Sequence, residues 1–186
     1  MIEICFHGRG GQGAVGASKI LASALFNEGK QVLAFPAFGA ERRGAPVKAF
    51  LRVSDREIRR RSMIYRPDVA IILDATLLQD VEAGREVKEG GWVVVNTPDP
   101  PESLRWLGKY RLATVDADSI AERLGLGSRA MPHVNTAMLG ASARATGLIS
   151  MEPLARSIRE NISSRADENV QGALEAYEKL RTYSVQ

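Results

Sequence analysis

The sequence predicts an α/β fold, a Rossmann-like, open and mostly parallel sheet with helices on both faces and a helical C-terminal third. Three observations support this prediction. An apolar strand runs into a glycine-rich loop and a helix near the N-terminus, and continuously apolar runs such as Val69 to Leu73 are typical of central parallel strands. From Asp118 onward, apolar residues recur with helical spacing. Because the 186 residues contain no linker or repeat, we expect a single domain spanning residues 1–186.

The first unit of the chain is a strand, a loop, a helix and a second strand. The first strand is expected over residues 2–7, and the helix over residues 14–27, where apolar side chains fall on one face. Gly29 is placed to end that helix, because glycine readily adopts the left-handed conformation found there. The second strand, residues 31–35, is expected to end at Pro36, which lacks a backbone N–H.

Strands and breaks alternate through the middle of the chain. In residues 47–53, small or aliphatic side chains alternate with Lys48, Phe50 and Arg52, which predicts a half-exposed strand. The remaining predictions are buried strands at 69–73 and 92–95, a weaker strand at 113–115 and a short helix at 77–88. Asp74 and Asn96 directly follow two of these strands, and open α/β sheets bind ligands beyond that edge.

The C-terminal third is expected to consist of helices, at residues 119–124, 135–146, 153–163 and 167–183. The second of these is rich in small residues, so another element can pack closely against it. Asp167 is a suitable N-cap for the last helix, because its carboxylate can accept a hydrogen bond from a free backbone N–H.

The glycine-rich loop is the main candidate site. Gly8, Gly10 and Gly13 have the spacing G-x-G-x-x-G and stand between a strand and a helix, the context that phosphate binding requires. Arg9, Gly11 and Gln12 complete the segment and belong to the candidate site. The structural alternative is a tight turn that binds nothing. NAD is disfavoured, because residues 32–38 contain no acid to hold the ribose, whereas NADP, contacted by Arg42 or Arg43, stays open.

Charge and composition exclude several classes of function. Residues 1–66 carry about seven more basic than acidic side chains, which would attract an anionic ligand or partner, or simply keep the chain soluble. No recognition motif for nucleic acid accompanies this charge, and no run of residues is apolar enough for a membrane span, so we expect a cytoplasmic chain. The run from Arg56 to Arg61 fits a solvated edge or a partner-binding segment.

No self-sufficient catalytic site is visible. The lone Cys5 excludes internal disulfides and cysteine-ligated clusters within the chain. His7 and His133 have no nucleophile or orienting acid beside them in the sequence, so structural roles are favoured for both, and we expect neither a catalytic residue nor a metal site.

Four segments together resemble the gamma subunit of pyruvate, or more generally 2-oxoacid, ferredoxin oxidoreductases. They are the glycine loop with its helix, the loop Pro36 to Gly44 leading into a strand, the stretch Asp68 to Asp74, and the sequence from Asn135 to Gly140. The resemblance covers roughly residues 1–180.

The resemblance implies a supporting role in oxidative decarboxylation of a 2-oxoacid to an acyl-coenzyme A, with reduction of ferredoxin. Thiamine diphosphate and iron–sulfur clusters would lie in the alpha, beta and delta subunits. This chain would help to bind coenzyme A through the glycine loop, Arg42, Arg43, Gly44 and Asn135, and would be inactive alone. Pyruvate, or a gamma subunit shared with the branched-chain enzyme, is the preferred specificity, and the isolated chain is expected to self-associate. The alternatives are a stand-alone NAD(P)-dependent oxidoreductase and an assembly subunit without a ligand.

Overall fold

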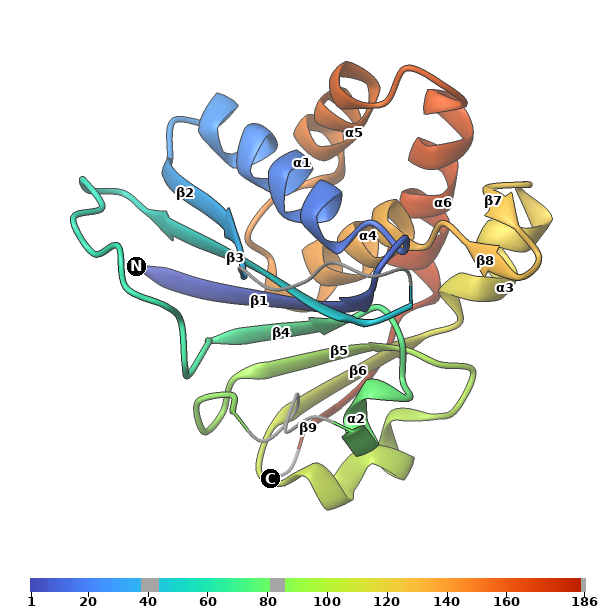
Figure 1. Cartoon of the computed structure of the whole chain (residues 1–186), viewed down its shortest axis with the longest axis horizontal. Coiled ribbons are helices and arrows are strands. Elements are labelled where there is room, and N and C mark those ends of the chain that lie inside the picture. The colour runs from blue at the N-terminus through green and yellow to red at the C-terminus, as the bar shows by residue number, and fades with distance from the viewer. Residues whose placement is uncertain (38–43, 81–85, 185–186) are drawn as a thin grey trace.

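A seven-stranded sheet runs through the molecule in the order β2–β3–β1–β4–β5–β6–β9 (Figure 1). The computed structural model describes residues 1–37, 44–80 and 86–184. Strands β3 and β9 are antiparallel to their neighbours and the other five point the same way, so the prediction of a mostly parallel sheet is confirmed. The strands are β1 (Ile2–Arg9), β2 (Gln31–Pro36), β3 (Pro46–Ser54), β4 (Val69–Ile72), β5 (Trp92–Asn96), β6 (Arg111–Val115) and β9 (Arg181–Ser184).

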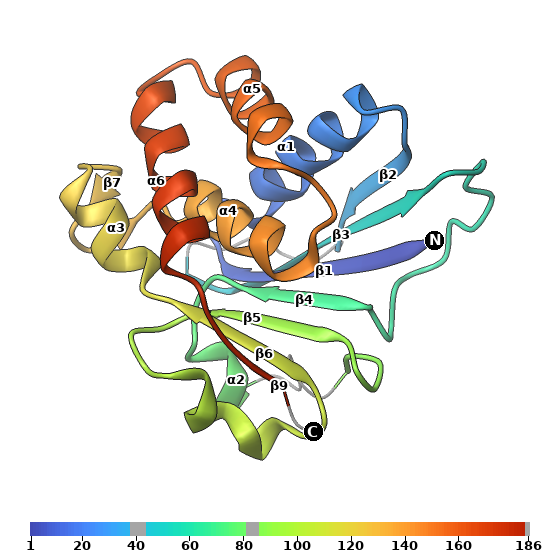
Figure 2. The same ribbon diagram turned by 180° about the vertical axis from the view of Figure 1, so that it is seen from behind.

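Helices cover both faces of the sheet, but unequally. The long helices lie on one face (Figure 2): α1 (Ala14–Asn27), α4 (Asn135–Thr146), α5 (Met151–Asn161) and α6 (Ala166–Lys179). The other face carries the short α2 (Leu77–Asp80) and the 3-10 helix η1 (Pro101–Leu107), which pack on a smaller apolar cluster. Helix α3 (Ala117–Arg123) and the small hairpin of β7 (Gly127–Ser128) and β8 (Met131–Pro132) flank the long helices. Among the described residues, no helix is long and apolar enough to cross a membrane.

The first helix forms as the sequence predicts. Gly13 precedes it at a φ of +84°, a left-handed conformation that costs glycine little. Gly29 follows it at a φ of +82°, and the next N–H, of Lys30, donates to the carbonyl of Leu25 at 3.1 Å. Both ends of α1 are therefore set by glycines, which fixes its N-terminus directly behind β1.

Helices α4 and α6 pack unusually closely, as the small residues of α4 predict. A Cβ atom added at Gly140 would lie 1.8 Å from the carbonyl oxygen of Ala173. The two backbones are therefore in direct contact at this point. A buried hydrogen bond of 2.9 Å from the hydroxyl of Thr136 to the amide oxygen of Asn169 joins the same two helices near their N-termini.

Residues 47–53 form a strand as predicted, but the prediction that this strand is half-exposed was wrong. Strand β3 lies between β2 and β1, and its central residues are buried. The alternation was misleading because Arg52, which counts as polar, is fully buried and pairs with Glu3 at 2.9 Å.

The predictions for two helix boundaries were also wrong. The described part of the 77–88 segment is helical only to Asp80, and residues 86–88 are not helical. The last helix ends at Lys179, because Arg181–Ser184 add an antiparallel edge strand to β6. Asp167 is not its N-cap: Arg165 holds that position, and Asp167 lies in the first turn.

Candidate anion-binding cavity

The glycine loop is confined on three sides by close neighbours. A Cβ atom at Gly8 would lie 3.3 Å from Cβ of Ala14, so the start of α1 packs on the end of β1. At Gly11 it would lie 2.7 Å from Sδ of Met131, and at Gly13 it would lie 2.8 Å from Nδ2 of Asn135. The glycines are needed because the loop runs directly beneath β8 and the first residue of α4.

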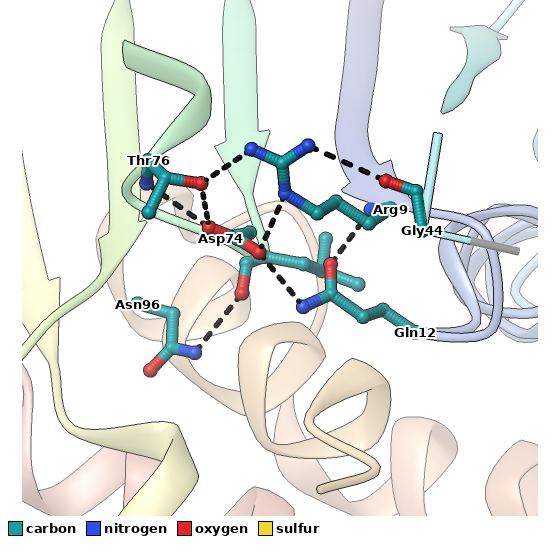
Figure 3. A network of polar contacts seen from close by, with 7 residues as sticks. Arg9, Gln12, Gly44, Asp74, Thr76 and Asn96 are labelled. Carbon is teal, nitrogen blue, oxygen red and sulfur yellow. Dashed lines mark hydrogen bonds and ion pairs between the residues drawn. The ribbon is translucent and has the colours of Figure 1, made fainter. Parts of the chain in front are cut away.

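Beside the loop, Arg9 is held in a polar network (Figure 3). Its Nε donates to Asp74 at 3.2 Å, one terminal nitrogen donates to the hydroxyl of Thr76 at 2.7 Å, and the other to the carbonyl of Gly44 at 3.3 Å. The backbone N–H of Arg9 donates to Oε1 of Gln12 at 2.7 Å. The network thus ties the glycine loop to the residues that follow β4 and precede β3.

Asp74 is the centre of this network. Besides Arg9, its carboxylate accepts hydrogen bonds from Nε2 of Gln12 at 3.2 Å and from the N–H of Thr76 at 3.0 Å. Partial burial raises the pKa of Asp74, but the hydrogen bonds from Thr76 and Gln12 and the charge of Arg9 outweigh it and leave the pKa below its usual value. Asp74 is therefore ionised at neutral pH and fixes the loop. Next to it, Asn96 donates to the carbonyl of Leu73 at 3.0 Å.

On the other side of the loop lies a cavity of about 610 Å³. The N-termini of three helices border it: Gly13 before α1, Asn135 of α4, and Arg165 before α6. Each helix N-terminus presents backbone N–H groups and a partial positive charge. The residues that line it are Gly11, Gln12, Gly13, Gly125, Leu126, Gly127, His133, Asn135, Asn161, Ile162, Ser163, Ser164, Arg165 and Asn169.

The electrostatics of this cavity favour an anion. None of the described residues that line it is acidic, and Arg165 contributes a permanent positive charge. The guanidinium of Arg165 donates to the carbonyls of Gly125 and Leu124, the latter at 2.9 Å, and its Nε pairs with Glu168 at 3.2 Å, so part of its charge is already balanced. Ser163 and Ser164 add hydroxyl donors from the loop before α6. Converging helix N-termini and hydroxyl groups are donors of the kind that suit phosphate groups.

The structure brings most of the sequence-predicted site residues together. Gly11, Gln12, Gly13 and Asn135 line the cavity, whereas Gly8 and Arg9 belong to the base of the loop and to the network. Gly10 and Gly44 join the two predicted loops, since the N–H of Gly44 donates to the carbonyl of Gly10 at 3.1 Å. Arg42 and Arg43 lie outside the described residues.

One wall of the cavity was missed in the sequence. Ser163, Ser164 and Arg165 come from the turn between α5 and α6, more than a hundred residues after the glycine loop. The only local signal was a pair of serines shortly before a helix, a pattern typical of N-termini. His133, which was assigned a structural role, is exposed at the rim of the cavity.

The buried titratable groups of β1 do not form a catalytic set. Burial lowers the pKa of His7 to about 3, so this imidazole is neutral, and burial raises the pKa of the Cys5 thiol to about 12. Among the described residues, no group of three or more His, Cys, Asp or Glu side chains is placed to hold a metal ion.

A Rossmann-like sheet with a cavity at three helix N-termini places the chain among the open α/β folds, which bind ligands beyond the carboxyl ends of their strands. Comparison with known proteins identifies it more closely. The family model described as "Pyruvate ferredoxin/flavodoxin oxidoreductase" matches residues 3–179. The chain belongs to this family, and within it corresponds to the gamma subunit.

Relatives from three organisms support this assignment. The chain is 52% identical to "Pyruvate/ketoisovalerate oxidoreductases common subunit gamma" of Thermococcus kodakarensis, with all of both chains covered. It is 48% identical to "Pyruvate synthase subunit PorC" of Methanothermobacter marburgensis, over 97% of this chain and 98% of that one. The crystal structure of the pyruvate oxidoreductase subunit PORC of Thermotoga maritima (EC 1.2.7.1) is 34% identical and covers 98% of both chains, with a TM-score of 0.82.

Proposed function

We propose that the cavity at the three helix N-termini binds the phosphate groups of coenzyme A for a pyruvate:ferredoxin oxidoreductase in which this chain is the gamma subunit. The observation that carries the proposal is the convergence of the N-termini of α1, α4 and α6 on one cavity without an acidic residue among its described lining. Coenzyme A is the anionic substrate that synthesis or cleavage of an acyl-coenzyme A requires, and its phosphates match this donor set in charge.

The residues that would hold the phosphates come from three places in the chain. The backbone at Gly11 and Gly13, the amide of Asn135 and the hydroxyls of Ser163 and Ser164 face the same cavity. The network around Asp74 holds the glycine loop from the opposite side, so the loop is positioned before any ligand binds. Arg42 and Arg43, which come before β3 in the sequence, would add two more positive charges.

The redox chemistry would belong to other chains. Cys5 is the only cysteine and is buried, so this chain cannot supply the several thiolates that an iron–sulfur cluster needs. We infer that alpha, beta and delta subunits carry thiamine diphosphate and the clusters and pass electrons to ferredoxin. Pyruvate is the substrate we favour, with a branched-chain 2-oxoacid as the second, and a cytoplasmic location stays a prediction.

The substitution Asn135→Asp tests the proposal in the assembled complex. It keeps the size of the side chain but places a negative charge over Gly13, where the helix N-termini converge. We expect the KM for coenzyme A to rise at least about tenfold, the equivalent of about 1.4 kcal/mol of lost binding, with little change in the KM for pyruvate.

The matched control is Asn27→Asp, the same chemical change at the exposed far end of α1. An unchanged KM for coenzyme A in Asn135→Asp, with the complex intact, would refute binding at this cavity. It would leave an assembly role for the chain. The substitution Arg43→Ala examines the neighbouring loop in the same assay, and we expect it to raise the same KM.

A further inference from the structure

The segment between β3 and β4, residues 55–66, is the one strongly basic motif that the cavity does not use. It contains five arginines, two acidic residues and no lysine. The register of β1 with β3 places this segment, which we call the arginine loop, beside the N-terminus of β1. The glycine loop follows the other end of β1, so the two loops lie at opposite ends of the sheet (Figure 1). The cavity lies beside the glycine loop.

A buried side chain fixes the shape of the arginine loop from below. Arg52 is fully buried, pairs with Glu3 at 2.9 Å, and donates to the backbone carbonyls of Arg60 at 3.1 Å and Met63 at 3.4 Å. Ile64, 5% exposed, inserts into the apolar cluster around Cys5. A buried ion pair adds little net stability. The pair of Arg52 with Glu3 is therefore better explained by the loop conformation that it specifies.

The exposed side chains of the arginine loop are of types that are common in protein interfaces. Arg56, Arg59, Arg60, Arg61 and Arg66 are exposed. Between them, Tyr65 is 74% exposed and Met63 39% exposed. Arginine, tyrosine and methionine are enriched at the centres of protein interfaces, from which lysine is depleted.

The arginines are available for a partner. In the part of the chain that the structure describes, Arg59 pairs only with Glu57, at 3.0 Å and in full contact with solvent. The side chains of Arg60 and Arg61 make no hydrogen bond or ion pair with described residues. Exposed pairs of the Arg59 kind contribute little stability, so giving them up costs the chain little.

We propose that the arginine loop is a docking surface for a carboxylate-rich surface of another subunit of the oxidoreductase complex. Guanidinium groups bind carboxylates with two parallel hydrogen bonds, and several in a row on a fixed backbone require a partner with several acids in register. Tyr65 and Met63 would bury apolar area at the centre of that contact. A purely electrostatic ligand would leave this apolar area exposed. The identity of the occupant as a subunit rests on the proposed function, whereas the chemistry of the surface does not.

The charge-reversed variant R60E/R61E tests this surface when it is co-expressed with the other subunits. Both side chains are exposed, so the fold should survive, and thermal unfolding of the variant chain checks this. We expect its affinity for the rest of the complex to fall at least about tenfold, with a weaker effect at high salt. The matched control K19E/K109E changes net charge by the same amount at exposed sites on α1 and before β6, and should assemble normally.

A second variant, R60K, identifies the partner surface directly. It keeps the charge and supplies an amine that a carbodiimide couples to a carboxylate in contact, so mass spectrometry should find residue 60 joined to Asp or Glu of another subunit. Normal assembly of R60E/R61E, together with cross-links only inside this chain, would overturn the proposal. So would binding of the loop to vesicles of phosphatidylglycerol or to an RNA oligonucleotide in place of the subunits.

Each of the two proposals can be refuted independently of the other. R60E/R61E should weaken assembly and leave coenzyme A binding unchanged in complexes that form at high protein concentration, whereas Asn135→Asp should do the reverse. Loss of both properties in both variants would contradict the proposal that the two sites act independently.

Discussion

Replacement of Gly140 by alanine is expected to separate α4 from α6 and to disturb the cavity that both helices border. The added Cβ would lie 1.8 Å from the carbonyl oxygen and 2.5 Å from the carbonyl carbon of Ala173. Ordinary contacts begin near 3.4 Å. The helices would therefore have to move apart by on the order of 1.5 Å in a close-packed interior.

The size of the effect follows from these contacts. Overpacking typically costs about 1–3 kcal/mol, and backbone atoms cannot rotate away as side chains do, so we expect Gly140→Ala to lose at least about 3 kcal/mol. For a chain of this length, that lowers Tm by roughly 6–12 °C. Gly172→Ala on α6 is the matched control, because its Cβ would meet its nearest neighbour, Leu124, at 3.4 Å. Better helix propensity should make this control neutral or more stable by up to about 1 kcal/mol.

Urea and thermal unfolding of both variants measure the difference. A loss of less than about 1 kcal/mol in Gly140→Ala would refute the close packing of α4 on α6. A comparable loss in Gly172→Ala would show that glycine is required there for a reason other than space.

Three further predictions concern buried groups of β1 and β3. His7 binds a proton only near pH 3 when folded but near pH 6.5 when unfolded, so stability is full above about pH 6.5 and falls toward pH 3, by up to about 1.4 kcal/mol per pH unit. His7→Gln should flatten this loss in urea titrations, and an unchanged slope would exclude His7 as its source. The thiol of Cys5 should resist iodoacetamide until the chain unfolds, and rapid alkylation of the native chain would contradict its burial. Arg52→Leu leaves the carboxylate of Glu3 without its buried partner and should lower the free energy of unfolding by about 3–5 kcal/mol. Normal stability and unchanged proteolysis of the arginine loop would show that the pair does not anchor this loop.

The sequence predicted well those features that depend on local chemistry. The glycines on either side of α1, the small residues of α4 and the apolar runs of β4 and β5 each have a direct backbone or packing consequence, and the structure has these elements where they were expected. Asn135 was included in the candidate site only through the family resemblance, and its close approach to Gly13 is a finding of the structure.

Long-range contacts explain what the sequence did not reveal. Arg52 made β3 look half-exposed, because a buried guanidinium cannot be recognised until its partner, Glu3, is known to lie beside it. Residues 181–183 were expected to extend the last helix, but Arg181–Ser184 pair with the open edge of β6. The wall formed by Ser163 to Arg165 joins the cavity only because α6 packs on α4.

The network around Asp74 changed the role of one predicted residue. Arg9 was expected to contact an anion, but its guanidinium donates to Asp74, Thr76 and Gly44. Its contribution to the proposed site is therefore to hold the glycine loop in place, while the backbone and Asn135 face the cavity. Whether Arg9 also contacts a ligand stays a prediction.

Hydrogen exchange of the assembled complex with and without coenzyme A tests the central claim most directly. The cavity is lined by segments far apart in the chain, among them residues 11–13 and residues 161–165. Coenzyme A should slow amide exchange in both segments, and pantetheine, which lacks the phosphates, should not. If coenzyme A protects neither segment while the complex remains active, the cavity at the three helix N-termini is not the coenzyme A site.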